Sequence, residues 1–148
     1  MKKIALFSCF AIFVFLLVSY GRPFVIIDNE TDNVIYLYSG TGENGVEPNE
    51  EEASDSMNPV RIEKGKSAKV PLTFYDIAMK DRKLYLGWKI GNIISSQATA
   101  VRYKEFDITS EEGSCAVKIS IKEGKDLVRS ISGNFCFKKL NLTLKNKR

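Results

Sequence analysis

The sequence predicts an all-β protein, a small antiparallel β-sandwich that follows an apolar N-terminal leader helix. Three observations favour this fold. Short runs of β-branched and aromatic residues alternate with polar residues at a period of two, as in half-buried strands. Clusters of glycine, asparagine, aspartate and serine separate these runs at regular spacing. No helix of ordinary length is visible after residue 21.

The leader occupies residues 1–21. Two lysines precede an apolar run of fifteen residues, 4–18, and Ser19 and Gly21 provide small residues where a secretory leader is cleaved. A bilayer-spanning helix needs about twenty apolar residues, so residues 4–20 are also marginally long enough to remain as an uncleaved signal anchor that holds the protein on the membrane. In both cases we expect the body to be exported, to the periplasm or to the cell exterior.

The body, residues 22–148, has the size of one domain with a single core, since 127 residues remain when the 21 of the leader are removed from 148. Two cysteines, Cys115 and Cys136, lie in it. An even pair of cysteines in an exported domain is typical of a disulfide. Closing a loop of about twenty residues stabilises a fold by about 3 kcal/mol in the chain-entropy model, so we expect this bond to brace the body.

In the first half of the body, the expected strands are 24–27, 34–38, 60–62 and 68–72. The first two flank a segment rich in turn formers, 28–33, and therefore predict a hairpin. The second strand is apolar on both faces, which is typical of a central or covered strand. Pro71 cannot donate a ladder hydrogen bond, so it favours an edge position for the fourth strand.

In the second half, the expected strands are 84–90, 98–108, 115–121, 127–131 and 135–144, while 74–83 is either one helical turn or a broad loop. Trp88 lies on the apolar face of its strand and is assigned to the core. A turn near Gly124 places Cys115 opposite a position close to Cys136. The phenylalanines of 135–137 are out of phase with the leucines that follow, which predicts a bulge at Lys138 and Lys139. Seven to nine short strands are typical of an immunoglobulin-like sandwich.

Charge is unevenly distributed along the body. Residues 23–59 contain nine acidic residues and no lysine or arginine, whereas residues 60–148 contain nineteen basic and nine acidic residues. The first part therefore carries a net charge of −9 and the second +10. Much of the acidic excess lies in residues 40–58. This segment is too polar to bury and too long for an ordinary connection, so we interpret it as a mobile acidic loop.

The acidic loop is the predicted binding site. We expect its carboxylates to contact another protein with a basic surface, because complementary charge steers two proteins together. The predicted contact residues are Glu47, Glu50, Glu51, Glu52 and Asp55. The alternative interpretation is a solvated loop, or one that pairs with the protein's own basic strands.

A second set of charges consists of basic residues at expected outward strand positions: Lys69, Lys89, Arg102, Lys104, Lys118, Lys138 and Lys139. They are scattered and not clustered with stacking aromatics, so we expect no nucleic-acid binding. Attraction to acidic polysaccharide or anionic lipid is the alternative that they support. Tyr36 and Tyr38 share a strand face that suits a sugar, but we prefer the interpretation that they cap the core with solvated hydroxyls.

Catalysis and metal binding are poorly supported. The chain contains no histidine, which is the residue best suited to acid–base work near neutral pH and the commonest metal ligand. Asp28, Glu30 and Asp32 have the alternate spacing of a calcium loop, yet Asn33 replaces the glycine of such a loop, so we interpret them as part of a turn. No nucleophile is paired with a base. We expect no catalytic residue, no metal and no cofactor.

Together these features predict an exported, non-enzymatic binding protein, namely an inhibitor or an immunity-type protein of the cell envelope. The alternatives are a surface-associated module that binds acidic polysaccharide or anionic lipid, and a structural envelope subunit. Two N-glycosylation sequons begin at Asn29 and Asn141, and we interpret both as chance matches.

Overall fold

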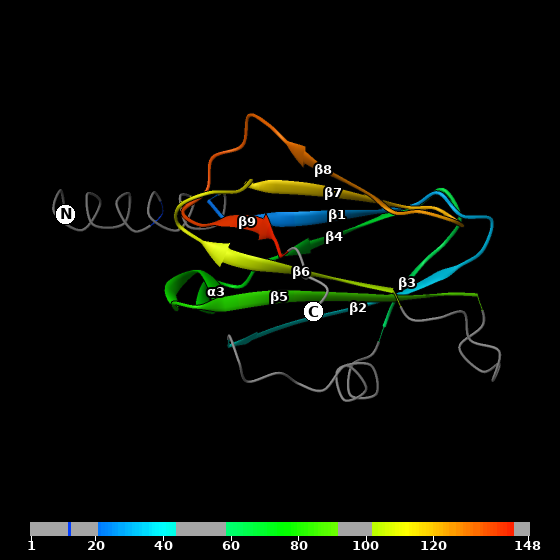
Figure 1. Ribbon diagram of the computed structural model, residues 1–148, viewed down its shortest axis with the longest axis horizontal. Coiled ribbons are helices and arrows are strands. Elements are labelled where there is room, and N and C mark those ends of the chain that lie inside the picture. The colour runs from blue at the N-terminus through cyan, green and yellow to red at the C-terminus, as the bar shows by residue number, and fades with distance from the viewer. Residues whose placement is uncertain (1–11, 13–20, 44–58, 92–101, 144–148) are drawn as a thin grey trace, which may run out of the picture.

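The computed structural model describes residue 12 and residues 21–43, 59–91 and 102–143. The strands in these ranges are β1 (Phe24–Asn29), β2 (Ile35–Glu43), β3 (Val60–Ile62), β4 (Ser67–Pro71), β5 (Arg82–Ile90), β6 (Arg102–Thr109), β7 (Ala116–Ile121), β8 (Leu127–Ile131) and β9 (Lys139–Leu142), and one short helix is α3 (Phe74–Ala78). The strands form a four-stranded sheet in the order β4-β1-β7-β8 and a five-stranded sheet in the order β3-β2-β5-β6-β9 (Figure 1). The prediction of an all-β sandwich is confirmed at this level.

The predicted leader helix lies almost entirely outside the described residues, which include only Ile12 of the first twenty. In the described part of the chain, no helix combines the length and the apolar character needed to cross a membrane.

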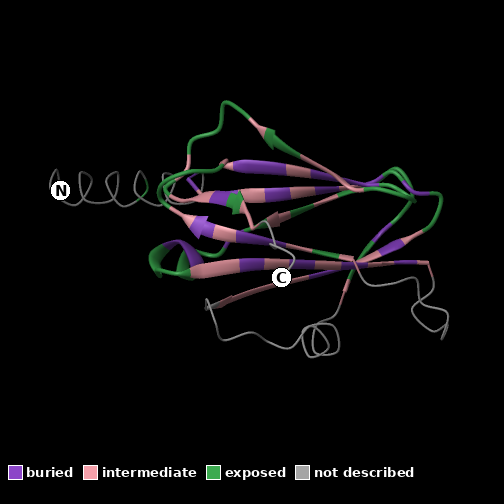
Figure 2. Ribbon diagram, in the orientation of Figure 1, coloured by how far each residue is buried: buried purple, intermediate pink, exposed green. Residues whose placement is uncertain are grey.

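The core lies between the two sheets because alternate residues of each strand point inward (Figure 2). In β1, every second residue from Val25 is buried. In β5, the predicted apolar face is buried from Leu84 to Ile90, and Trp88 is 0% exposed, as the sequence predicts. Phe106 of β6 is also fully buried in this cluster. The core therefore joins residues of both sheets.

The predicted hairpin between the first two strands is wrong. β1 belongs to the four-stranded sheet and β2 to the five-stranded sheet, so the intervening turn carries the chain from one sheet to the other. β1 instead pairs with β4 in antiparallel fashion and with β7 in parallel fashion, with Val25 opposite Val117 in the parallel pair. The sandwich is therefore not purely antiparallel.

Asn29 explains why the turn crosses between sheets. Its side chain is 1% exposed, and its Nδ2 donates to the carbonyls of Asn33 at 2.7 Å and Ile62 at 3.0 Å. Its Oδ1 accepts from the backbone N–H of Thr31 at 3.0 Å and from the Thr31 hydroxyl at 2.7 Å. One amide thus joins the end of β1 to its own turn and to β3 in the other sheet. The first sequon lies in this buried network, whereas Asn141 of the second is exposed.

Three further segments can be compared with the sequence predictions. β2 continues to Glu43, so residues 40–43 belong to a strand and not to the acidic loop. Residues 74–83 contain the helical turn α3, which was one of the two alternatives. Residues 135–137 form no strand, and β9 begins at Lys139 without the predicted bulge. The edge position predicted from Pro71 is confirmed, since β4 is the outer strand of its sheet.

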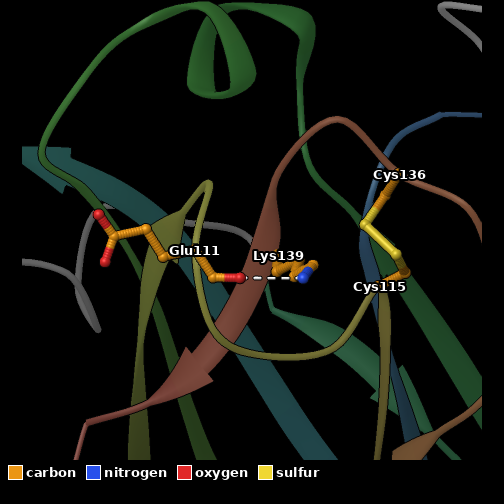
Figure 3. Close-up of a disulfide and its surroundings, with 4 residues drawn as sticks. All are labelled: Glu111, Cys115, Cys136 and Lys139. Atoms are coloured by element: carbon orange, nitrogen blue, oxygen red, sulfur yellow. Dashed lines mark hydrogen bonds between the residues drawn. A yellow bond between two sulfur atoms is a disulfide. The ribbon is translucent and has the colours of Figure 1, made fainter.

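The predicted disulfide is present. Cys115, just before β7, is bonded to Cys136, in the segment that leads to β9, and their Cα atoms are 5.5 Å apart (Figure 3). Next to it, the backbones of Ser114 and Leu140 exchange two hydrogen bonds of 3.0 and 2.9 Å. Gly113 permits this approach, because its φ is +130° and a Cβ there would lie 2.5 Å from the Leu140 carbonyl oxygen. The bond therefore closes one end of the sandwich across both sheets.

Loss of the disulfide is expected to lower the free energy of unfolding by about 3 kcal/mol, because a loop spanning 21 positions is released in the unfolded chain. The measurement is urea unfolding followed by Trp88 fluorescence for C115A, C136A and C115A/C136A. Either single variant breaks the same bond, so each should lose as much as the double variant. Single-variant losses that add up to the double-variant loss would contradict this account.

Substitution N29A is expected to lower the free energy of unfolding by about 2 kcal/mol, because it removes the side-chain donor to the buried carbonyl of Ile62 and one of the two donors to the carbonyl of Asn33, which keeps the Thr31 hydroxyl. The matched control is N141A at the exposed second sequon, which should change stability by less than about 0.5 kcal/mol. Equal losses in the two variants would show that the Asn29 network does not join the sheets.

Candidate binding surfaces

The two ends of the sandwich have different chemistry. We call the end that contains residues 30–34, 63–66 and 122–126 the turn end, and it lies at the right in Figure 1. We call the opposite end, which contains residues 21–23, 72–81, 110–115 and 132–138, the disulfide end. Strand direction fixes this division, since β1 and β7 begin at the disulfide end and run in parallel toward the turn end.

At the turn end, each of the three alternating carboxylates from the first part of the chain binds a lysine. Glu30 lies 3.1 Å from the Nζ of Lys122, and Asp32 lies 2.5 Å from the Nζ of Lys64. Asp28, at the end of β1, pairs with Lys118 of β7. These oxygens therefore hold ammonium groups from the second half of the chain, which agrees with the interpretation of a turn over that of a calcium loop.

Hydrogen bonds from the lysines and from neighbouring serines lower the pKa values of these three carboxyls. Burial acts to raise the pKa of Asp28, but hydrogen bonds from Lys118 and Ser67 outweigh burial and lower it. Hydrogen bonds from Ser120 and Lys122 lower the pKa of Glu30, and the hydrogen bond from Lys64 lowers that of Asp32. All three groups are therefore held in the charged form.

These ion pairs account for part of the charge asymmetry between residues 23–59 and residues 60–148. Three of the nine acidic residues in 23–59 have lysine partners from residues 60–148. The other six acidic residues lie close together in sequence between the last residue of β2 and the first residue of β3: Glu43, Glu47, Glu50, Glu51, Glu52 and Asp55. The acidic excess that remains is therefore concentrated in one connection.

The five predicted contact residues, 47, 50, 51, 52 and 55, lie outside the described residues, but the strands on either side of them are described. β3 pairs with β2 only at Ile35, Tyr36 and Leu37. The chain thus leaves β2 at Glu43 and returns opposite Leu37, some six residues back along the same strand. Both ends of the acidic connection are therefore attached to neighbouring strands of the five-stranded sheet.

Most of the predicted outward basic residues have partners within the protein. The Nζ of Lys69 lies 3.8 Å from the centroid of the Phe24 ring, and Lys139 donates to the carbonyl of Glu111 at 2.9 Å (Figure 3). Arg102 forms an ion pair with Asp126 at 3.1 Å and also donates to two carbonyls of the same turn. With Lys118 and Lys89, which lies near the Tyr38 ring, five of the seven predicted residues have such contacts. These contacts weaken the alternative of a basic surface for lipid or polysaccharide.

The tyrosine pair on β2 lies on the outer face of its sheet, because the alternate residues Ile35 and Leu37 point into the core. Tyr38 is only 8% exposed, and the ammonium of Lys89 lies 5.6 Å from its ring centroid. A ring with so little exposed area is poorly suited to stack on a sugar, but its position on the outer face also differs from the prediction that these tyrosines cap the core.

A buried ion pair that the sequence interpretation missed lies at the disulfide end. The Asp76 side chain is 1% exposed and accepts from Nη2 of Arg82 at 3.1 Å. The same Nη2 donates to the hydroxyl of Thr41 at 3.2 Å. Asp76 also accepts from the backbone N–H of Thr73 at 3.1 Å and from the Thr73 hydroxyl, so it completes the capping box of α3. The spacing Thr73-x-x-Asp76 was a sequence signal for this cap.

The ion pair anchors α3 to the five-stranded sheet, since Arg82 begins β5 and Thr41 belongs to β2. Burial acts to raise the pKa of Asp76, but hydrogen bonds from Thr73, Thr41 and Arg82 outweigh burial and hold the pKa below its ordinary value of 3.8. Every polar partner of this carboxylate belongs to the fold around it, so its role is to hold the helix in place.

The disulfide end also exposes large apolar side chains. Phe74 is 60% exposed, and Tyr75 and Met79 beside it in or next to α3 are exposed as well. Phe135 is 70% exposed and contacts Phe137, also exposed, edge to face at 5.5 Å between centroids. The sequence interpretation placed these two phenylalanines in a strand and gave no sign of this surface.

No protein-family model matches the chain, and the curated proteins also give no match.

Substitution D76N is expected to lower the free energy of unfolding at neutral pH by about 3 kcal/mol, because it leaves Arg82 buried without its counter-charge. The folded pKa of Asp76 is lowered, so its contribution is complete above its ordinary value of 3.8 and is lost as the pH falls through the folded pKa. The stability gap between wild type and D76N should therefore narrow below pH 3.8, measured by urea unfolding across this range.

The matched control is D81N, because Asp81 is an exposed acid of the same segment. Asparagine tolerates the left-handed conformation of this position, φ 53°, as aspartate does, so we expect a change below about 0.5 kcal/mol at every pH. A gap for D76N that does not change with pH would rule out the charged pair as the cause.

Proposed function

We propose that this chain is an exported, non-enzymatic binding protein with an immunoglobulin-like sandwich, and that its partner is another protein with a basic surface. The class that fits best is an inhibitor or an immunity-type protein of the cell envelope. The disulfide supports the exported location, because such bonds persist in oxidising compartments. The leader-like sequence of residues 1–21 supports it independently.

The distribution of carboxylates is the main observation that supports this proposal. Asp28, Glu30 and Asp32 are matched by lysines at the turn end, whereas the other six acidic residues of 23–59 are concentrated from Glu43 to Asp55 with no lysine or arginine among them. A connection of this charge, attached at both ends to a braced sheet, attracts a cationic partner over a distance of about one Debye length, roughly 8 Å at physiological salt. Such attraction acts mainly on the association rate.

The test compares two variants that each remove three negative charges. The first, E50Q/E51Q/E52Q, acts on the acidic connection, and the second, D81N/E111Q/E112Q, acts on exposed acids at the disulfide end. The partner is first captured from the native envelope fraction on immobilised wild-type protein and identified by mass spectrometry. Its association rate is then measured with each variant at several salt concentrations.

We expect the first variant to associate more slowly by on the order of tenfold at low salt, with a weaker salt dependence, and the second to behave as wild type. Equal rates for wild type and both variants would show that the acidic connection does not contact the partner. A captured partner with an acidic contact surface would overturn the proposal.

A further inference from the structure

Exposed apolar side chains are concentrated at the disulfide end. Eight large hydrophobic residues of the described part of the chain are exposed, and five of them lie in or beside two elements of this end, α3 and the segment 132–138. We call these five the apolar rim: Phe74, Tyr75, Met79, Phe135 and Phe137. In Figure 2, α3 and the loop between β8 and β9 show their exposed residues in green at the left of the sandwich.

The two elements of the rim flank the point where the N-terminal segment joins the sandwich. The backbone N–H of Phe137 donates to the carbonyl of Gly21 at 3.0 Å, and that of Leu72, two residues before α3, donates to the carbonyl of Pro23 at 3.1 Å. Residues 21–23 therefore lie between the phenylalanine pair and the helix. Gly21, the first residue of the described body, is therefore in direct contact with one element of the rim.

Both elements are fixed in position by strong contacts. Cys136, between the two phenylalanines, is bonded to Cys115, and α3 is anchored by the ion pair of Asp76 with Arg82. Binding usually costs conformational entropy because flexible groups become ordered. This cost is smaller here, because both backbone elements are already fixed to the sandwich. The rim is therefore a preformed surface.

The apolar sequence N-terminal to Gly21 indicates which kind of surface the rim contacts. Residues 4–18 form a fifteen-residue apolar run, and only residues 19 and 20 separate that run from Gly21. Three residues span at most about 10 Å even when fully extended. If the apolar run is inserted in a bilayer, Gly21 and the rim beside it are thus within about 10 Å of the lipid surface.

We infer that the apolar rim docks on the surface of the lipid bilayer that holds residues 4–20. Phenylalanine, tyrosine and methionine side chains on such a rim would enter the boundary between headgroups and acyl chains, where aromatic rings are favoured. The charges at this end nearly balance, with Arg22, Lys80 and Lys138 against Asp76, Asp81, Glu111 and Glu112. The contact is therefore apolar in character, and the ion-paired turn end points away from the membrane.

The inference does not depend on the acidic connection, because none of the five rim residues belongs to it, so the two proposals fail separately. The test uses the full-length chain in phosphatidylcholine vesicles, with and without bromine on the lipid acyl chains. Single tryptophans are introduced as F74W and F135W in the rim and as K125W at the exposed turn end. Trp88 is 0% exposed and gives a constant background, which the wild-type protein measures.

We expect bromolipids to quench F74W and F135W at least severalfold more than K125W. Equal quenching at the two ends would overturn the proposed orientation. Quenching of F135W in native envelope membranes but not in protein-free vesicles would also overturn it, because the rim would then need a protein partner. Recovery of the native protein from the membrane-free fraction with Arg22 as its first residue would exclude the anchor itself.

A second experiment distinguishes docking of the apolar rim on lipid from simple attachment of the protein near the membrane. F74W is placed in the background F135S/F137S, in which the phenylalanine pair is polar but the disulfide and Gly21 contact are kept. Docking predicts that quenching of F74W falls by at least half. Unchanged quenching would show that the chain connection alone holds this end near lipid. Thermal unfolding of each variant, expected to match wild type, confirms that the sandwich is intact.

Discussion

The parallel pairing of β1 with β7 is the constraint on which the rest of the structure depends. It places β1 between β4 and β7 in the interior of its sheet, where Val25 and Ile27 become fully buried. It also sets Asp28 beside Lys118 and brings Glu30 to Lys122, so the acidic first strand and a basic later strand neutralise each other. At its other end, the same pairing carries residues 21–23 to the disulfide.

That constraint gives the two ends of the molecule separate properties. The turn end is rich in ion pairs and side-chain caps, of which Asn29 is the most deeply buried. The disulfide end is braced covalently and displays Phe74 and Phe135. The acidic connection leaves β2 at Glu43 and rejoins the fold at β3, an outer strand of the five-stranded sheet. Proposed contacts with lipid and with a protein therefore involve different sets of residues.

Sequence patterns correctly predicted the features that depend on local alternation of apolar and polar residues or on an even number of cysteines. The inward face of β5 around Trp88 and the bond of Cys115 to Cys136 are of this kind. Local patterns do not predict which strands pair. The turn formers near Asn29, for example, suit a hairpin and a crossing between sheets equally well. The hydrogen bonds of Asn29 to Asn33 and Ile62 decide between these two, and they exist only in the folded chain.

The same reasoning applies to the surfaces. Alternation around Cys136 favoured a strand, but its bond to Cys115 and the contact of Phe137 with Gly21 hold this segment across the end of the sandwich. The spacing of Thr73 and Asp76 was an available signal for a helix cap that the sequence interpretation missed, whereas the ion pair with Arg82 required the chain to turn back over the helix. The acidic contact residues were found from composition alone and stay a prediction.

The order of strands also has a consequence for biosynthesis. β1 is the first strand to leave the ribosome, and its parallel neighbour β7 ends at Ile121 of a chain of 148 residues. The four-stranded sheet is therefore incomplete until most of the polypeptide has been translated, since contacts so distant in sequence form late and slowly. Until β7 is made, β1 lacks its parallel partner, so the growing chain cannot bury Val25 and Ile27 as the finished sandwich does.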